Sequence, residues 1–220
     1  MQVNLMDFWP RIWEATYQTL LMVGISLLAA TLIGLPLGII LVVTRQGGLL
    51  ENKPVFNAFS TVVNFFRSIP FIILLVAILP FTRFVVGSSI GTAAAVVPLV
   101  IFSAPYIARL VESSLLEVKP GVIEAAEAMG ASPWQIIRRV YIPEGLSSIV
   151  LNLTIATIGL VGASAMAGFV GGGGLGDLAI SYGYQRFETD IMIATVLLLV
   201  LIVQITQTIG NFASKKIRRQ

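Results

Sequence analysis

Long apolar stretches without a charged residue alternate with short charged segments along the chain. Four stretches carry no charge at all, at residues 15–44, 84–108, 145–176 and 191–213. A fifth stretch, at 55–82, is interrupted only by Arg67. About 20 apolar residues in a helix cross a bilayer, and uninterrupted runs indicate helices rather than the alternating strands of a barrel. We therefore predict five membrane-spanning helices, at residues 17–43, 57–81, 86–108, 146–170 and 191–213.

The composition agrees with this pattern. Of the 220 residues, 56% are hydrophobic and only 11% are charged, whereas roughly a quarter of a typical soluble domain is charged. A soluble domain of this size could not bury helices that are apolar on every face. The predicted fold class is all-α: a polytopic membrane protein whose residues 1–220 form one domain. The first apolar run is also too long for a cleavable signal peptide.

The distribution of Lys and Arg predicts the orientation. With five spans and an outside N-terminus, the cytoplasmic segments hold ten of these residues: Arg45, Lys53, Arg109, Lys119, Arg138, Arg139, Lys215, Lys216, Arg218 and Arg219. The outer segments hold three, Arg11, Arg83 and Arg186. Cytoplasmic segments of membrane proteins are enriched in positive charge. We therefore predict an outside N-terminus and a cytoplasmic C-terminus, and we attribute the basic tail to topology and lipid headgroups, not to nucleic acid.

Several chemistries are missing from the sequence. The chain has neither cysteine nor histidine, which removes thiol nucleophiles, imidazole bases and the usual zinc sites. It has no G-x-x-x-x-G-K-[ST] segment for ATP phosphates. Gly171, Gly173 and Gly176 satisfy the spacing of a dinucleotide-binding motif, but they end an apolar run and not a soluble strand. We expect close helix packing and a turn there, and close packing also at Gly34 and Gly38.

The cytoplasmic segment 119–143 is a polar island with helix signals. Pro120 suits a first helical turn, and Gly130 suits a left-handed helix cap. Ser132 and Gln135, which flank Pro133, predict a capping box for a second helix. We predict two short helices meeting at Gly130. From the residues alone, such a hairpin could be an ordinary surface feature or a docking surface for a partner.

The segment Arg67-Ser68-Ile69-Pro70 is the most unusual feature inside a predicted span. An arginine in a membrane segment is costly unless it reaches water or a partner. One interpretation places Arg67 near the cytoplasmic surface, because Asn57, Thr61 and Asn64 precede it in the same span. The other interpretation makes it a gate or a substrate contact.

Segment 119–143 resembles the EAA loop of type I ABC-importer permeases. The resemblance rests on Glu124-Ala125-Ala126, on Gly130 and on Pro143, with Ile142 where that family usually has Leu. Further segments, FFRSIPFIILL at 65–75 and SAMAGFVGGGGLG at 164–176, resemble the methionine-import permease family. Together the similar segments cover most of the chain.

The resemblance implies a permease without enzymatic activity of its own. It implies a homodimer in a bacterial cell membrane, a cytoplasmic ATPase dimer and an extracytoplasmic methionine-binding protein, with ATP and Mg held by the ATPase and no cofactor held by this chain. The residues that would couple to the ATPase are Glu124, Ala125, Ala126, Gly130 and Pro143. A possible gate or substrate path comprises Arg67, Ser68, Pro70 and Met166.

Other transport functions remain open. A permease for another amino acid or small molecule would fit the same pattern. An ATP-independent secondary transporter or a small channel fits less well, because the sequence has neither an internal repeat nor an evident selectivity sequence.

Overall fold

The computed structural model describes residues 5–218, and within that range every regular element is a helix. Arg219, which belongs to the predicted basic tail, lies outside the described residues. The helices are α1 (Leu5–Thr44), α2 (Lys53–Ser68), α3 (Phe71–Ala77), α4 (Leu79–Val86), α5 (Thr92–Leu116), α6 (Pro120–Ala128), α7 (Pro133–Ile136), α8 (Ile142–Ala167), α9 (Gly174–Leu178) and α10 (Thr189–Arg218).

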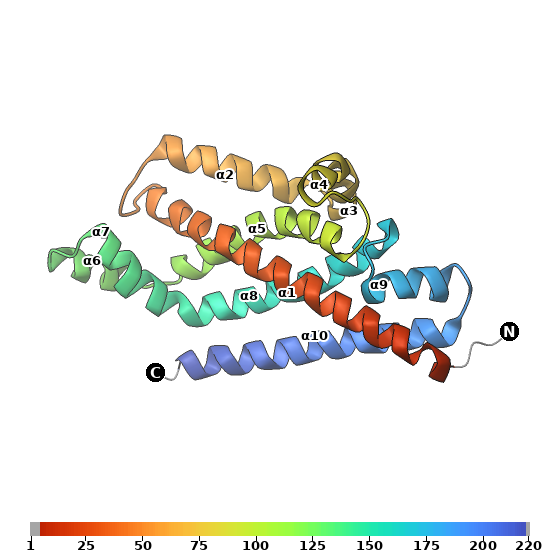
Figure 1. Cartoon of the computed structure of the whole chain (residues 1–220). Helices are drawn as coiled ribbons and strands as arrows, with labels where there is room; N and C mark the ends of the chain where they lie inside the picture. Colours follow the sequence, from red (N-terminus) through yellow and green to blue (C-terminus); the bar gives the residue numbers. More distant parts are fainter. Residues whose placement is uncertain (1–4, 219–220) are drawn as a thin grey trace.

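Helices α1, α5, α8 and α10 run side by side and form the body of the molecule (Figure 1). Helix α1 packs along α5, which packs on α8, which packs on α10. Helix α1 begins and α10 ends at opposite ends of the bundle, and α10 ends on the side that carries α6 and α7 (Figure 1). Among the described residues, four helical segments are long and apolar enough to span a membrane, and there are five if the bent pair α2–α3 is counted as one broken span.

The second predicted span, 57–81, is not one straight helix. Helices α2 and α3 meet at an angle of 98°. The cause is Pro70, which has no N–H and forces Ile69 into an extended conformation (φ −85°, ψ 122°). Ser68 adds a hydrogen bond from its Oγ to the carbonyl of Asn64, 2.8 Å away. The segment predicted as the span 57–81 is therefore built from more than one helix, with a break at Ile69 and Pro70.

The third span is also shifted from its predicted position at 86–108. Its first residues instead end α4 and form a turn, in which Gly87 adopts φ 81°. Helix α5 then continues to Leu116, eight residues past the predicted end. The charged residues Arg109 and Glu112, which follow that predicted end, lie within this helix and form an ion pair.

Two glycines of α1 allow the close packing of α1 on α5. A Cβ built on Gly34 would lie 2.7 Å from the carbonyl oxygen of Ala104, and one on Gly38 would lie 2.7 Å from that of Ala108. Backbones approach this closely only where the side chain is a hydrogen atom. The packing predicted for Gly34 and Gly38 is confirmed.

The glycine-rich segment after α8 turns the chain back toward the bundle. Gly171, Gly173 and Gly174 all have positive φ, between 74° and 78°. The returning helix α9 packs against α1, where Gln18 Oε1 accepts the N–H of Gly174 at 2.8 Å and Thr19 Oγ1 accepts the N–H of Leu175 at 2.8 Å. The predicted turn is confirmed, and α9 was not foreseen.

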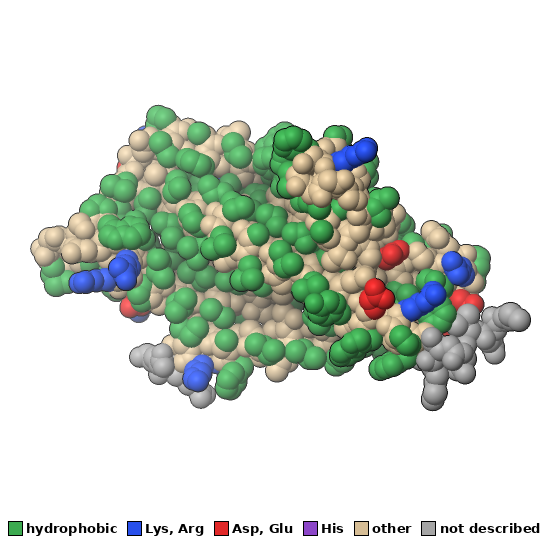
Figure 2. Space-filling view, viewed as in Figure 1, with side chains coloured by type: hydrophobic (Ala, Val, Ile, Leu, Met, Phe, Trp, Pro, Cys, Tyr) green, Lys and Arg blue, Asp and Glu red, His purple; other side chains and the backbone are tan. Residues whose placement is uncertain are grey.

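Apolar side chains cover the flank of the molecule, and charged side chains gather toward its two ends and at α4 (Figure 2). Large apolar residues are exposed along the long helices, among them Leu28, Leu32, Val200 and Phe212. A patch this extensive would be unstable in water, and it matches the surface that a lipid bilayer requires.

We predict that Gly34→Val destabilises the protein by about 1–3 kcal/mol, because the added side chain would force α1 away from α5. Thermal unfolding in detergent is the measurement. Gly24→Val is the matched control, since Gly24 lies in the same helix and a Cβ there meets no atom within 4 Å. Equal stability of the two variants would contradict the packing role of Gly34.

Candidate functional site

The segment between α5 and α8 forms a compact projection at one end of the bundle (Figure 1). Pro120 begins α6, and Gly130 closes it with φ 78°. Ser132 Oγ accepts the N–H of Gln135, and Gln135 Oε1 accepts the N–H of Ser132 at 2.8 Å. The helix start, the left-handed glycine and the capping box are all confirmed.

The second of the two predicted helices does not end within this segment. Helix α7 continues through a π-helical turn at Ile137–Tyr141 into α8. A proline at 143 cannot donate an N–H, and its ring would collide with the carbonyl four residues earlier in a regular helix. The π-helical turn changes the hydrogen-bond register just before Pro143, because Ile142 donates its N–H to Ile137. Pro143 therefore lies in the first turn of α8, within a helical segment that is continuous from α7. No separate turn at Pro143 leads the chain back into the bundle.

The inner side of the projection is anchored in the bundle. Val118, Ala126, Ile136 and Tyr141 are buried in one apolar cluster that also contains residues of α1 and α5. Ala126, with 5% of its surface exposed, faces this cluster and not the outer surface. Its small methyl group lets α6 lie close to the π-helical turn. Ala126 was expected at the docking surface, and its burial corrects that expectation.

The outer side of the projection exposes large apolar side chains. Met129 is 81% exposed and Trp134 is 68% exposed, on either side of Gly130. Glu124 and Ala125 are also exposed. Met and Trp in an exposed position are typical of partner-binding surfaces. Neither Met129 nor Trp134 was predicted from the sequence, although an apolar residue beside a helix-ending glycine in a polar loop is a usable signal.

A groove of about 420 Å³ separates α6 from the loop that follows α1. Its walls include Arg45, Glu124, Glu127 and Tyr141. Burial raises the pKa of the Tyr141 hydroxyl, with Arg45 opposing and Glu127 adding to the effect. This hydroxyl therefore stays protonated at neutral pH. No group of three or more Asp, Glu, His or Cys side chains in residues 5–218 could hold a metal ion.

A second groove, of about 530 Å³, lies at the bend between α2 and α3. It brings together all four residues predicted as a gate or substrate path, Arg67, Ser68, Pro70 and Met166. Most of its other lining is apolar or glycine: Ile69, Phe71, Ile72, Phe102, Gly159, Gly162 and Ala163. Their role in transport stays a prediction.

The position of Arg67 along α2 bears on its two interpretations. Arg67 is fourteen residues after the start of α2, which is roughly 21 Å at about 1.5 Å per residue. It faces a groove shared with Met166, which is one residue from the end of α8. This distance separates Arg67 from the loop that precedes α2. Arg67 lies beside the groove, well away from that loop.

These features define a class of protein. Four helices that are long and apolar enough to span a membrane, a bent helix pair and a helical projection at one end are the architecture of a polytopic membrane protein. The family described as "Binding-protein-dependent transport system inner membrane component" matches residues 30–219. The chain belongs to this family.

Relatives with similar sequences are transport permeases. A probable D-methionine transport system permease protein of Vibrio cholerae is 52% identical over 203 residues, which cover 92% of this chain and 90% of the relative. A methionine import system permease protein of Bacillus subtilis is 46% identical over 209 residues, which cover 95% of this chain and 94% of the relative.

Solved structures show the same fold. A chain in inward-facing conformations of the MetNI methionine ABC transporter aligns with a TM-score of 0.95 and 45% identity, covering 96% of this chain and 98% of that one. A chain of an amino acid ABC transporter with histidines aligns with a TM-score of 0.79 and 21% identity, over 98% of this chain and 100% of that one. At that identity the second comparison supports the fold alone.

Proposed function

We propose that this chain is the membrane-spanning permease subunit of an ATP-driven importer for methionine. The observation that carries the proposal is the agreement between relatives described as methionine permeases and a methionine ABC transporter chain that aligns with a TM-score of 0.95. A permease for a related amino acid is the alternative, because the apolar groove alone would accept one.

The proposal includes partners. A separate ATPase dimer binds ATP and Mg, since this sequence carries no phosphate-binding loop. A second copy of the chain completes the central path, and an extracytoplasmic binding protein delivers the substrate. Similarity to a chain of the MetNI methionine ABC transporter supports the ATPase, and membership of a binding-protein-dependent transport family supports the binding protein.

The proposed orientation places the α6–α7 projection in the cytoplasm and the N-terminus outside. Ten Lys and Arg residues lie on the proposed cytoplasmic side, with Arg109 seven residues before the end of α5, and three lie on the other. This excess still agrees with the positive-inside rule. It puts the exposed Met129 and Trp134 where a cytoplasmic ATPase could bind them.

In the proposed mechanism the ATPase binds the exposed face formed by Glu124, Ala125, Met129, Gly130 and Trp134. Closure of the ATPase on ATP displaces this face. The projection transmits the displacement because its inner side is packed into the bundle and because α7 is continuous with α8. The two permease subunits then alternate between inward-facing and outward-facing states.

We further propose that the groove at the α2–α3 bend is part of the substrate path. Methionine is a zwitterion with a flexible, polarisable apolar side chain. Phe102 and Met166 offer apolar, adaptable contacts, and Arg67 is the single charged residue among the described residues that line the groove. A guanidinium at the edge of an apolar groove suits a substrate carboxylate.

We predict that Gly130→Val uncouples the permease from its ATPase. Val at φ 78° is strained by at least about 1–2 kcal/mol, so the angle between α6 and α7 would change. Co-purification of the ATPase and methionine-stimulated hydrolysis should fall, while membrane insertion persists. Gly121→Val is the control, since both glycines are exposed with open space around the Cβ but Gly121 lacks a positive φ. Normal transport by Gly130→Val would refute the coupling role.

We predict ATP-dependent methionine uptake into vesicles that contain this chain, its ATPase and its binding protein. Omission of ATP should abolish uptake, which distinguishes the importer from a secondary transporter. Excess arginine or histidine should not inhibit, because the described lining of the groove has no carboxylate to pair with a second positive charge. Competition by arginine as strong as that by unlabelled methionine would overturn the substrate assignment while leaving the importer assignment intact.

We predict that Gly162→Leu lowers uptake at least about tenfold by filling the groove, which corresponds to about 1.4 kcal/mol. ATPase association should be unchanged, because Gly162 is distant in sequence from the α6–α7 projection and nothing lies within 4 Å of its Cβ position. Gly24→Leu adds the same side chain to open space outside the groove and should transport normally. Equal uptake by both variants would remove this groove from the substrate path.

A further inference from the structure

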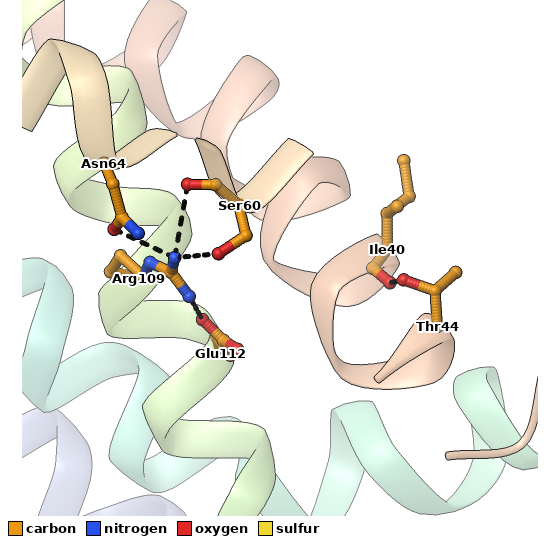
Figure 3. A network of polar contacts seen from close by, with 6 residues as sticks. All are labelled: Ile40, Thr44, Ser60, Asn64, Arg109 and Glu112. Atoms are coloured by element: carbon orange, nitrogen blue, oxygen red, sulfur yellow. Dashed lines mark hydrogen bonds and ion pairs between the residues drawn. The ribbon is translucent and has the colours of Figure 1, made fainter. Parts of the chain in front are cut away.

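Arg109 forms a polar network that joins α5 to α2 (Figure 3). On α5, its Nη1 forms an ion pair with Glu112 Oε2 at 2.5 Å. On α2, its Nη2 donates to Ser60 Oγ at 2.6 Å and to Asn64 Oδ1 at 2.9 Å, with a longer contact to the Ser60 carbonyl at 3.4 Å. One guanidinium therefore holds two turns of the neighbouring helix.

Helix α2 packs on α1 and α5 through a small apolar contact. Val63 is the only buried side chain among the described residues of α2, and it packs against Leu41 of α1 and Ala108 of α5. Ala108 is the residue before Arg109, so the apolar contact and the polar network lie side by side. Apolar contacts, to which Phe56 of α2 also contributes, are not directional, whereas hydrogen bonds to a planar guanidinium favour one register of α2.

The partners in this network also depend on one another. An arginine inside a membrane helix needs a counter-charge and acceptors for its N–H groups. Glu112, only 8% exposed, supplies the charge. Ser60 and Asn64 supply acceptors that water would otherwise have to supply. Arg109 is therefore more stable with α2 in place, and α2 is held in place by Arg109.

The network lies between the coupling projection and the groove. From Arg109, α5 continues for seven residues to Leu116 and connects through three residues to α6. Leu115 at the end of α5 and Val118 in the connection are buried in the same apolar cluster as Ala126 of α6, so the short connection and this cluster link α5 to α6. On α2, Arg67 lies three residues beyond Asn64 and lines the groove.

We propose that Arg109 is a positioning residue that transmits movement of α6 to α2, so that the groove at the α2–α3 bend changes shape together with the coupling projection. The inference rests on the proposed function, because ATP is the assumed source of the movement. It assigns Arg109 a role in transmission and no direct contact with substrate.

The chain lacks cysteine, so single cysteines can report on each end of this path. Ser68→Cys reports on the groove, and Ala128→Cys, which is exposed at the end of α6, reports on the projection. Maleimide labelling rates are measured with and without ATP in the assembled transporter with its ATPase and binding protein. We expect ATP to change both rates in the parent chain. If ATP changes neither, the proposed function itself fails.

In the Arg109→Met background we expect the ATP-dependent change in labelling at Ala128→Cys to persist. At Ser68→Cys we expect the labelling rates with and without ATP to become equal. Arg109→Lys keeps the charge but donates from a single nitrogen, so we expect it to restore part of the change. A purely structural defect would reduce the ATP-dependent change in labelling rate at both cysteines together. An unchanged ATP response at Ser68→Cys in Arg109→Met, or a parallel loss at both reporters, would overturn the inference.

A second variant decides the question if Arg109→Met does not assemble. Asn64→Leu removes an acceptor on α2 and leaves the Arg109–Glu112 pair intact. Asn57→Leu is its control, seven residues earlier on the same helix and outside the network. We expect a smaller ATP response at Ser68→Cys in Asn64→Leu than in Asn57→Leu. Equal responses would contradict the transmission role.

Discussion

The constraint on which this structure depends is that a backbone inside a bilayer must pair its own N–H and C=O groups. The constraint explains why the regular structure of residues 5–218 is helical. It also explains where irregular backbone is tolerated. The turn that precedes α9 is stabilised by Gln18 and Thr19 of α1, which accept the free amides of Gly174 and Leu175. The helix break falls at Pro70, a residue that has no backbone N–H to pair.

Features that local chemistry determines could be predicted from the sequence. The apolar runs located the long helices, Gly130 adopted the left-handed cap, and Ser132 and Gln135 formed their capping box. The features that were missed depend on contacts between distant residues. Arg109 was expected in a loop because its charge was considered alone, whereas its acceptors lie about 45 to 49 positions away on α2. The burial of Ala126 could not be predicted from the sequence, because alanine is compatible with both buried and exposed positions of a helix.

The candidate sites were predicted unevenly for the same reason. Arg67, Ser68 and Pro70 were found together because they are adjacent in sequence, and Met166 because a soft side chain stood among glycines. Phe102 and Gly162 complete the groove, but only the packing of α5 and α8 brings them there. On the projection, Glu124 and Gly130 carried the family resemblance, whereas the exposure of Met129 and Trp134 depends on how α6 and α7 bury Ala126 and Ile136.

The two arginines near α2 illustrate how surroundings separate structural from functional charge. Arg109 has a carboxylate partner, and that pair is the only ion pair in the described part of the chain. Arg67 therefore has no carboxylate partner there, although it lies beside an apolar groove. A guanidinium in such a place is stabilised most by an anion that enters the groove, because the low dielectric strengthens their attraction. An amino acid carboxylate is such an anion. The bonds from Arg109 to Ser60 and Asn64 connect α5 to α2, while Glu112 balances the charge of Arg109 within α5. Under the proposed function, Arg67 is the group that a zwitterionic substrate would neutralise.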